Sequence, residues 1–449
     1  MELEPIDTCI VVYLVCLCAV FSVTRLRNRR CGSTWHLFFL SWGALLFVTK
    51  VCLVNAWPGI SFTEYSGGLV NHFLVGCSLG YVGAILLVTG RPTTKREAFE
   101  TIKTAEFIVE RISTNVLLAL FLLGMLFFII RVSQTGFSGT MLSDLRVLYG
   151  TESGGLLFRV SSHVFVVSQI IMLASGVLDA KTGINLWRVF LVTLACAPLS
   201  LAQGGRTFLV AGFMYYTLSF WCTRLVIKSE NNKSYWNDFS KITGAFALAM
   251  LAFAALGFAR GGYGDEFNAL RTIFVWPASS LRALDSWGHW SEAYTPSIGS
   301  TILNFPNSLL IRFGILEDTP ISTMLTDGAA RFMRLNDSSW CCPPTIIPYL
   351  ILECGIANLA LSSFFFGFLL EATVRLYTCR SWMLQSLSCQ LLYIAAMSIQ
   401  INAFNEMFFA MMFWSFVIGF LYRQYGQKPA TDSRNSTGQV PSGAQRSIV

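Results

Sequence analysis

Charged residues are scarce in this chain, and their scarcity excludes most soluble folds. Only 13% of the 449 residues are Asp, Glu, Lys or Arg, whereas 54% are hydrophobic. A soluble domain usually carries about 25% charged residues. Many stretches have almost no charge over about 20 residues, the length at which a helix crosses the hydrocarbon core of a bilayer. The composition therefore predicts an all-α polytopic membrane protein.

Several motifs of soluble enzymes are also missing. The sequence has no CxxC pair that would suit zinc, and it lacks the D-x-D motif of many metal-dependent nucleotide-sugar glycosyltransferases. "GCSLG" at 76–80 matches the G-x-S-x-G pattern of hydrolases, but it lies inside a predicted span, whereas a nucleophile elbow needs a strand-to-helix turn. We interpret Gly76 and Gly80 as a surface for close helix packing. We expect no metal, no cofactor and no nucleic-acid partner.

The first apolar run indicates how the chain is oriented. Residues 1–7 ("MELEPID") are acidic, unlike the basic opening of a signal peptide, and the run at 10–23 is followed by "RLRNRR". Positive charge after a first span is retained in the cytoplasm, so we expect the N-terminus to lie outside. The eleven spans that we predict lie near 6–24, 35–54, 67–89, 114–132, 156–178, 186–203, 207–227, 242–258, 346–374, 384–403 and 407–422.

The basic residues agree with this topology. The segments that it assigns to the cytoplasm hold 20 of the 32 Lys and Arg residues, including every lysine except Lys50. One of these segments, 90–113, is expected to be an interfacial helix. We predict a transmembrane domain at 1–425 that includes a large external loop at 259–345, and a polar, disordered cytoplasmic tail at 426–449.

The external loop contains arginine but no lysine. Its arginines are Arg260, Arg271, Arg282, Arg312, Arg331 and Arg334. A guanidinium group is a planar fork that binds a phosphate or carboxylate at two points, which an ammonium group does not do. The loop also has eight acidic residues, so ion pairs that only stabilise the loop are the alternative interpretation.

Arg206 follows a turn of only two glycines, Gly204 and Gly205, between two predicted spans. It falls at the start of the next helix on the external side. A helix N-terminus has partial positive charge and free N–H groups, so an anion there would meet both the helix end and the guanidinium group. An interfacial anchor that reaches lipid headgroups is the alternative. Arg159 lies about one turn into its own span from the same side and is expected to point into the bundle.

The loop contains further polar and aromatic candidates for a site. Asp265 and Glu266 are adjacent carboxylates, His289 and Glu292 are one helical turn apart, and Trp276 is one of several tryptophans. Aromatic faces stack on sugars and arginines suit a pyrophosphate. We therefore expect the external end of the bundle to bind a glycan linked to a lipid pyrophosphate.

Four stretches in this order resemble the Wzy-type polymerases of oligosaccharide repeat units, most closely those of enterobacterial common antigen. They are "QGGRTFLVAGFMYY", "ARGGYGDEFNALRTIFVWP", "NFPNSLLIRFG" and "PPTIIPYLILECGIANLALSSFFFGFLLEATVRLY". The similarity spans roughly 201–377. It implies a GT-C-related helical bundle in a bacterial inner membrane. The implied reaction transfers a growing glycan from undecaprenyl pyrophosphate to a new lipid-linked repeat unit on the periplasmic face.

The resemblance also suggests partners and roles. The partners would be an undecaprenyl-pyrophosphate-linked oligosaccharide, membrane lipids and a chain-length regulator protein. Stabilisation of charge on the leaving pyrophosphate is expected first from Arg206 and Arg260, then from Arg271 and Arg282. The candidate bases are Asp265 and Glu266, followed by His289 and Glu292. Arg159 and Trp276 are expected to contact substrate.

Two other functions stay open at this point. An O-antigen ligase is also all-helical with a large periplasmic loop that carries arginine and histidine, and His289 is compatible with it. A transporter or flippase of lipid-linked glycans would place polar groups along a path at mid-membrane depth on broken helices.

Overall fold

The computed structural model describes eleven α-helices of thirteen residues or more and a few shorter pieces of this chain. The described residues are 4–26, 34–56, 60–88, 93–135, 156–202, 207–227, 345–399 and 406–426, with short pieces at 278–285, 289, 295–296, 314–315, 334–336 and 339–340. Almost all of them are helical. The exception is an antiparallel pair of very short strands, β1 (Arg334–Asn336) and β2 (Ser339–Trp340).

Most predicted spans coincide with helices. These helices are α1 (Pro5–Leu26), α2 (Thr34–Val54), α3 (Glu64–Leu87), α5 (Ser113–Thr135), α7 (Leu156–Thr182), α8 (Leu186–Ala202), α9 (Thr207–Ile227), α16 (Trp382–Met397) and α17 (Glu406–Leu421). Five helical segments of the described chain are long and apolar enough to cross a membrane, namely α1, α2, α3, 113–133 of α5, and 356–377. The chain is therefore a helical membrane protein. The span predicted at 242–258 and the tail after 426 lie outside the described residues.

One predicted span is divided in the structure. Instead of a single helix at 346–374, the chain forms α14 (Ile347–Cys354), a turn of 3-10 helix η3 (Ile356–Asn358) and α15 (Leu359–Tyr377). The break occurs at Gly355, whose φ of +80° is readily adopted only by glycine. A side chain there would also press on Pro296, whose Cγ lies 3.1 Å from the position of a Cβ.

The interfacial helix expected within 90–113 is α4 (Lys95–Phe107), which continues through the π-helical turn η1 (Ile108–Ile112) into α5. Its start is fixed by a capping box, in which Thr94 and Glu97 satisfy each other's backbone N–H groups. The short segment η4 (Tyr422–Gly426) follows α17 and packs on α4, where Phe107 and Tyr422 meet edge to face with ring centroids 5.6 Å apart.

Glycines allow the tightest helix pairs. A side chain at Gly76 or Gly80 of α3 would collide with backbone carbonyls of α15, and one at Gly367 of α15 would collide with the backbone of α3. The helix-packing role predicted for Gly76 and Gly80 is therefore confirmed. Gly176 serves the same purpose between α7 and α9. Backbones that approach this closely gain dispersion contacts along their whole length.

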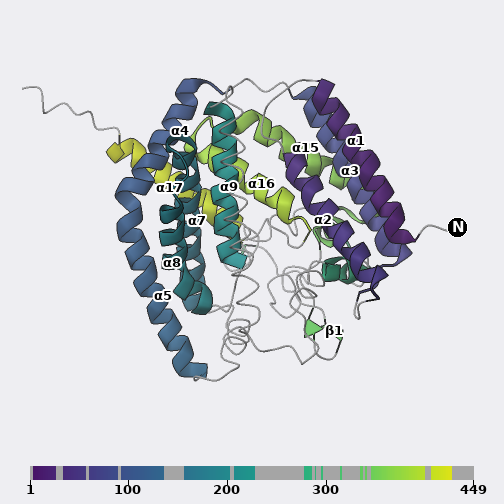
Figure 1. The fold of residues 1–449 in the computed structure, drawn as a ribbon, viewed down its shortest axis with the longest axis horizontal. Helices are drawn as coiled ribbons and strands as arrows, with labels where there is room; N and C mark the ends of the chain where they lie inside the picture. The colour runs from purple at the N-terminus through teal and green to yellow at the C-terminus, as the bar shows by residue number, and fades with distance from the viewer. Residues whose placement is uncertain are drawn as a thin grey trace, which may run out of the picture.

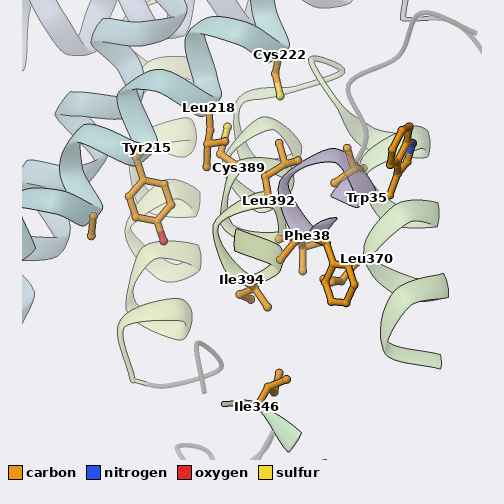
Figure 2. Packing of buried hydrophobic residues seen from close by; sticks show 14 of the residues in the cluster. Trp35, Phe38, Tyr215, Leu218, Cys222, Ile346, Leu370, Cys389, Leu392 and Ile394 are labelled. Carbon is orange, nitrogen blue, oxygen red and sulfur yellow. The ribbon is translucent and has the colours of Figure 1, made fainter. Parts of the chain in front are cut away.

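The helices form two groups that meet at α16. Helices α1, α2, α3 and α15 lie on one side of the molecule, and α5, α7, α8 and α9 lie on the other (Figure 1). Figure 2 shows how α16 joins them, because Cys389, Leu392 and Ile394 lie between Tyr215 and Leu218 of α9 and Phe38 of α2. Tyr215 also stacks on Tyr393, with ring centroids 5.0 Å apart.

Two ends of the bundle can be distinguished. At the loop end, defined by Ala56, Thr63, Ile346 and Ser398, the described loop piece 278–285 meets the helices. At the α4 end, α4 packs across α7, α9 and α16. Figure 1 shows α4 at the top of the view, and the ends of α2 and α5 at the bottom.

Candidate functional site

The piece 278–285 of the long loop is a short helix that is buried at the loop end. Ala278, Ser280, Leu281 and Leu284 are all fully buried, and both leucines belong to the main apolar cluster of the bundle. Burial of a leucine side chain contributes about 1.5–3 kcal/mol relative to leaving it in water. This part of the loop is therefore part of the folded core.

Asp285 joins this short helix to the beginning of α3. One of its carboxylate oxygens accepts hydrogen bonds from the hydroxyl of Thr63 at 2.5 Å and from the hydroxyl of Ser66 at 3.3 Å. Thr63 is also the N-cap of α3, since its oxygen accepts from the backbone N–H of Ser66 at 3.1 Å. A carboxylate near a helix N-terminus is further stabilised by the helix dipole.

Two residues predicted for the site are close to this contact along the chain or through a neighbour of Thr63. Arg282 is half-buried one helical turn before Asp285. His289 is exposed, and its ring stacks on Tyr65 in the first turn of α3, with centroids 4.0 Å apart and planes 14° from parallel. We call Thr63, Tyr65, Arg282, Asp285 and His289 the loop-end cluster. It combines a cation, an anion, an imidazole and an aromatic face, which are groups that bind phosphate and sugar.

Most of the predicted site residues lie elsewhere in the chain. Those outside the described residues are Arg206, Arg260, Asp265, Glu266, Arg271, Trp276 and Glu292. Arg159 is in the first turn of α7, and its side chain is outside the described part. Of the predicted set, the structure therefore brings Arg282 and His289 to one end of the bundle. The remaining assignments stay predictions.

Asp285 is a member of this cluster that sequence reasoning missed. The sequence indicated it only as one of eight acids that could pair within the loop. The spacing of Arg282 and Asp285 could have indicated that Asp285 belongs to the site, because residues three positions apart share one side of a helix. No signal in the sequence indicates its partners Thr63 and Ser66, which precede it by more than 200 positions.

The α4 end has a different kind of charge arrangement. Glu371 of α15 is fully buried, and it accepts from the backbone N–H and hydroxyl of Thr34 at 2.8 and 2.7 Å and from Nε of Arg375 at 2.6 Å. A buried carboxylate with three donors is satisfied. It caps the start of α2 and joins α2 to α15, so its role is structural.

A second buried carboxylate at the same end is equally satisfied. Asp179 of α7 forms an ion pair with Arg188, and it accepts from the hydroxyl of Tyr216 at 2.8 Å and from the backbone N–H of Asn185 at 2.9 Å. These bonds close the α7–α8 turn and fasten it to α9. In the described part of the chain, no three His, Cys, Asp or Glu side chains gather in a way that could hold a metal ion.

Comparisons with known proteins do not identify the chain. No family model matches it, and searches of curated proteins and of solved structures found no match.

Proposed function

We propose that this protein is a membrane glycosyltransferase that joins undecaprenyl-pyrophosphate-linked repeat units into a surface polysaccharide. The single observation that carries the proposal is the loop-end cluster, in which Asp285 binds Thr63 and the exposed imidazole of His289 stacks on Tyr65, with Arg282 on the same short helix as Asp285. The resemblance of 201–377 to Wzy-type polymerases supports the same assignment.

The proposal includes a topology and a location. The chain would cross a bacterial inner membrane eleven times in a GT-C-related bundle, with a periplasmic N-terminus, a periplasmic loop and a cytoplasmic C-terminus. The placement of the basic residues supports this orientation. In it the loop-end cluster faces the periplasm, where lipid-linked repeat units are assembled.

The chemistry is a substitution at a sugar carbon. A hydroxyl group of the acceptor sugar forms a bond to C1 of the donor sugar, while the bond from C1 to the pyrophosphate oxygen breaks. The proton of that hydroxyl passes to a base, and undecaprenyl pyrophosphate leaves with the bonding electrons. Arg206, Arg260, Arg271 and Arg282 are proposed to stabilise the charge that grows on the pyrophosphate, which is commonly the largest single contribution to catalysis.

The base is assigned to Asp265 or Glu266, with His289 as the next candidate. Such a base contributes about 10²–10⁴-fold to the rate. Asp285 has a different role, because Thr63 and Ser66 already engage its carboxylate. It is proposed to be a positioning residue, because it fastens the short helix 278–285, and with it Arg282, to the start of α3. Arg159, Trp276 and Glu292 are proposed to contact the glycan.

The decisive experiment deletes the gene and examines the surface glycan as a gel ladder. Complementation is then attempted with the native gene, Arg206→Ala, Arg206→Lys and Arg282→Ala, with Arg25→Ala at the α4 end as the matched control. We expect the control to restore the ladder, and the three site variants to leave single capped units at normal protein level. Arg206→Lys should retain little activity because an ammonium group lacks the two-point fork.

Two outcomes contradict the proposal. A normal ladder from Arg206→Ala removes the anion-binding role of that residue, and an unchanged glycan after gene deletion removes the polymerase function. Loss of all capping, including single units, identifies an O-antigen ligase instead. The exposed position of His289, stacked on Tyr65 at the loop end, favours the ligase as the second candidate.

A further inference from the structure

The α4 end carries an exposed aromatic ring with two lysines around it. The ring is Phe99 of α4, which is 45% exposed. Nζ of Lys103, one turn further along α4, lies 4.8 Å from the ring centroid. Nζ of Lys181, at the end of α7, lies 5.7 Å from the same centroid. We call these three residues the Phe99 patch.

The patch is not needed to hold α4 in place. A neighbouring side of α4 does this, because Ala98, Ile102 and Ala105 are buried against the bundle. Thr101 adds a hydrogen bond from its hydroxyl to the carbonyl oxygen of Cys379 at 3.3 Å. In the described part of the chain, Phe99 stays 45% exposed and is not part of this buried side.

The charges of the patch are also uncompensated. Neither Lys103 nor Lys181 forms an ion pair with a carboxylate among the residues that the structure describes. Asp179, two positions before Lys181, is already occupied by Arg188 and Tyr216. Two ammonium groups that approach one ring repel each other, and the negative face of the ring offsets this only in part. An anion between them would remove the repulsion.

The position of the patch suggests the source of that anion. α4 lies across the ends of α7, α9 and α16 and continues through η1 into α5, whose membrane-crossing segment begins at Ser113. α4, which carries two of the three patch residues, lies at an end of the helical bundle (Figure 1). The ends of membrane-spanning helices are where lipid headgroups lie. A phospholipid offers a phosphate for the lysines and an apolar glycerol and acyl region for the ring.

We propose that the Phe99 patch is a binding site for the phosphate headgroup of an anionic phospholipid. Lys103 and Lys181 contact the phosphate from two sides, and Phe99 contacts the apolar part below it. A free phosphate ion would satisfy the lysines but would leave the ring exposed. The inference does not depend on the proposed enzymatic function.

The test measures thermal unfolding of the full-length purified protein in a non-ionic detergent. Phosphatidylglycerol, phosphatidylcholine or inorganic phosphate is added at increasing concentration, because a ligand that binds the folded state raises Tm with its concentration. We expect phosphatidylglycerol to raise Tm and the other two to have little effect. Lys103→Gln/Lys181→Gln should weaken the apparent affinity for phosphatidylglycerol about tenfold or more, since each basic residue near an anionic lipid surface contributes substantially to binding.

The controls distinguish the loss of this binding site from a general loss of positive charge and from misfolding of the variant. Arg25→Gln removes an exposed basic residue at the same end of the bundle, on α1, and should keep the native response to phosphatidylglycerol. Phe99→Ala should lower the lipid effect and leave any response to inorganic phosphate unchanged. Far-UV circular dichroism without added lipid verifies that every variant is folded. An equal response of the double-lysine variant and the native protein, or an equal response to phosphatidylcholine, overturns the proposal.

Discussion

At the scale of single residues, Gln169 is a buried polar side chain of the described part of the chain that has no hydrogen-bond partner for either of its polar atoms. It is 1% exposed in α7, and neither its amide oxygen nor its amide nitrogen has a hydrogen-bond partner among the described residues. It shares the α9-facing side of α7 with Met172 and Gly176, which contact Gly212 and the backbone of Tyr216. Gln169 therefore faces the beginning of α9, and its unpaired polar atoms lower the stability of the fold.

The substitution Gln169→Met tests the free-energy cost of burying this unpaired amide. The replacement has similar length and no polar atoms, so we expect an unchanged or higher Tm, because two unsatisfied buried groups are removed. The matched control is Gln385→Met. Gln385 is also fully buried, but its oxygen accepts from the backbone N–H of Cys379 at 2.9 Å. Loss of that acceptor should cost about 1–3 kcal/mol.

The measurement is thermal unfolding of both variants in the same detergent, followed by the glycan ladder. If Gln169→Met lowers Tm as much as Gln385→Met does, the amide has a structural partner and the interpretation is wrong. A stable Gln169→Met variant with a shortened ladder would instead indicate that the amide contacts the glycan.

At the scale of helices, the α3–α15 pair combines side-chain packing with direct backbone contact. Gly80 lies so close to α15 that a methyl group there would collide with the carbonyl oxygen of Phe364. Gly83, one turn away on the same helix, has only ordinary contacts, the nearest at 3.5 Å from the ring of Phe368. The two glycines therefore differ in what a methyl group would meet.

Gly80→Ala and Gly83→Ala form a matched pair that tests this difference. We expect Gly83→Ala to be neutral or to stabilise the protein by up to about 1 kcal/mol, since alanine is the better helix former. Gly80→Ala should push the two helices apart and lower Tm strongly, because overpacking of a tight contact typically costs about 1–3 kcal/mol. Equal Tm values for the two variants in detergent would show that α3 and α15 are not in backbone contact.

The break between α14 and α15 is a second feature at this scale. Hydropathy treats 346–374 as one apolar run, yet the chain turns at Gly355. The backbone N–H of Ile346 then reaches the carbonyl oxygen of Ser398 at 2.9 Å, while Trp42 donates its Nε1 to the hydroxyl of Ser398 at 3.0 Å. The break thus closes the loop end by linking α14, α16 and α2.

At the scale of the whole molecule, the two ends of the bundle have different roles. Glu371 and Asp179, the buried carboxylates of the α4 end, are both fully satisfied by neighbouring donors. The loop end instead has an exposed His289 and a half-buried Arg282. Buried charges in a membrane bundle are costly unless each charge is paired, so these carboxylates of the α4 end hold helices together.

The orientation of the bundle can be tested with reporter fusions. Green fluorescent protein fused after Val449 should fluoresce, because the C-terminus is predicted to be cytoplasmic. Alkaline phosphatase should be active when inserted between β1 and β2, and inactive when inserted at Gly183 in the α7–α8 turn. The physical reason is the retention of basic segments in the cytoplasm. The opposite pattern at all three sites would invert the topology and place the loop-end cluster in the cytoplasm.

The sequence by itself determined the class of the protein and the extent of most helices. Long apolar runs have no stable alternative to a helix in lipid, because every backbone polar group must be satisfied within the segment. The small residues at Gly76 and Gly80 were sufficient to predict a close helix contact. Residue type alone also indicated Arg282 and His289 as candidates for the site.

Only the tertiary structure decided which residues meet. The bond from Thr63 to Asp285, the stacking of His289 on Tyr65 and the approach of Lys181 to Phe99 each join residues that lie far apart in the chain. Uniformly apolar helices lack a strong polar face that would fix their rotation about their own axis. Hydropathy therefore cannot indicate which helices pack against one another. The packing of the helices depends on local shape, such as the close contacts at the glycines of α3 and the turn at Gly355.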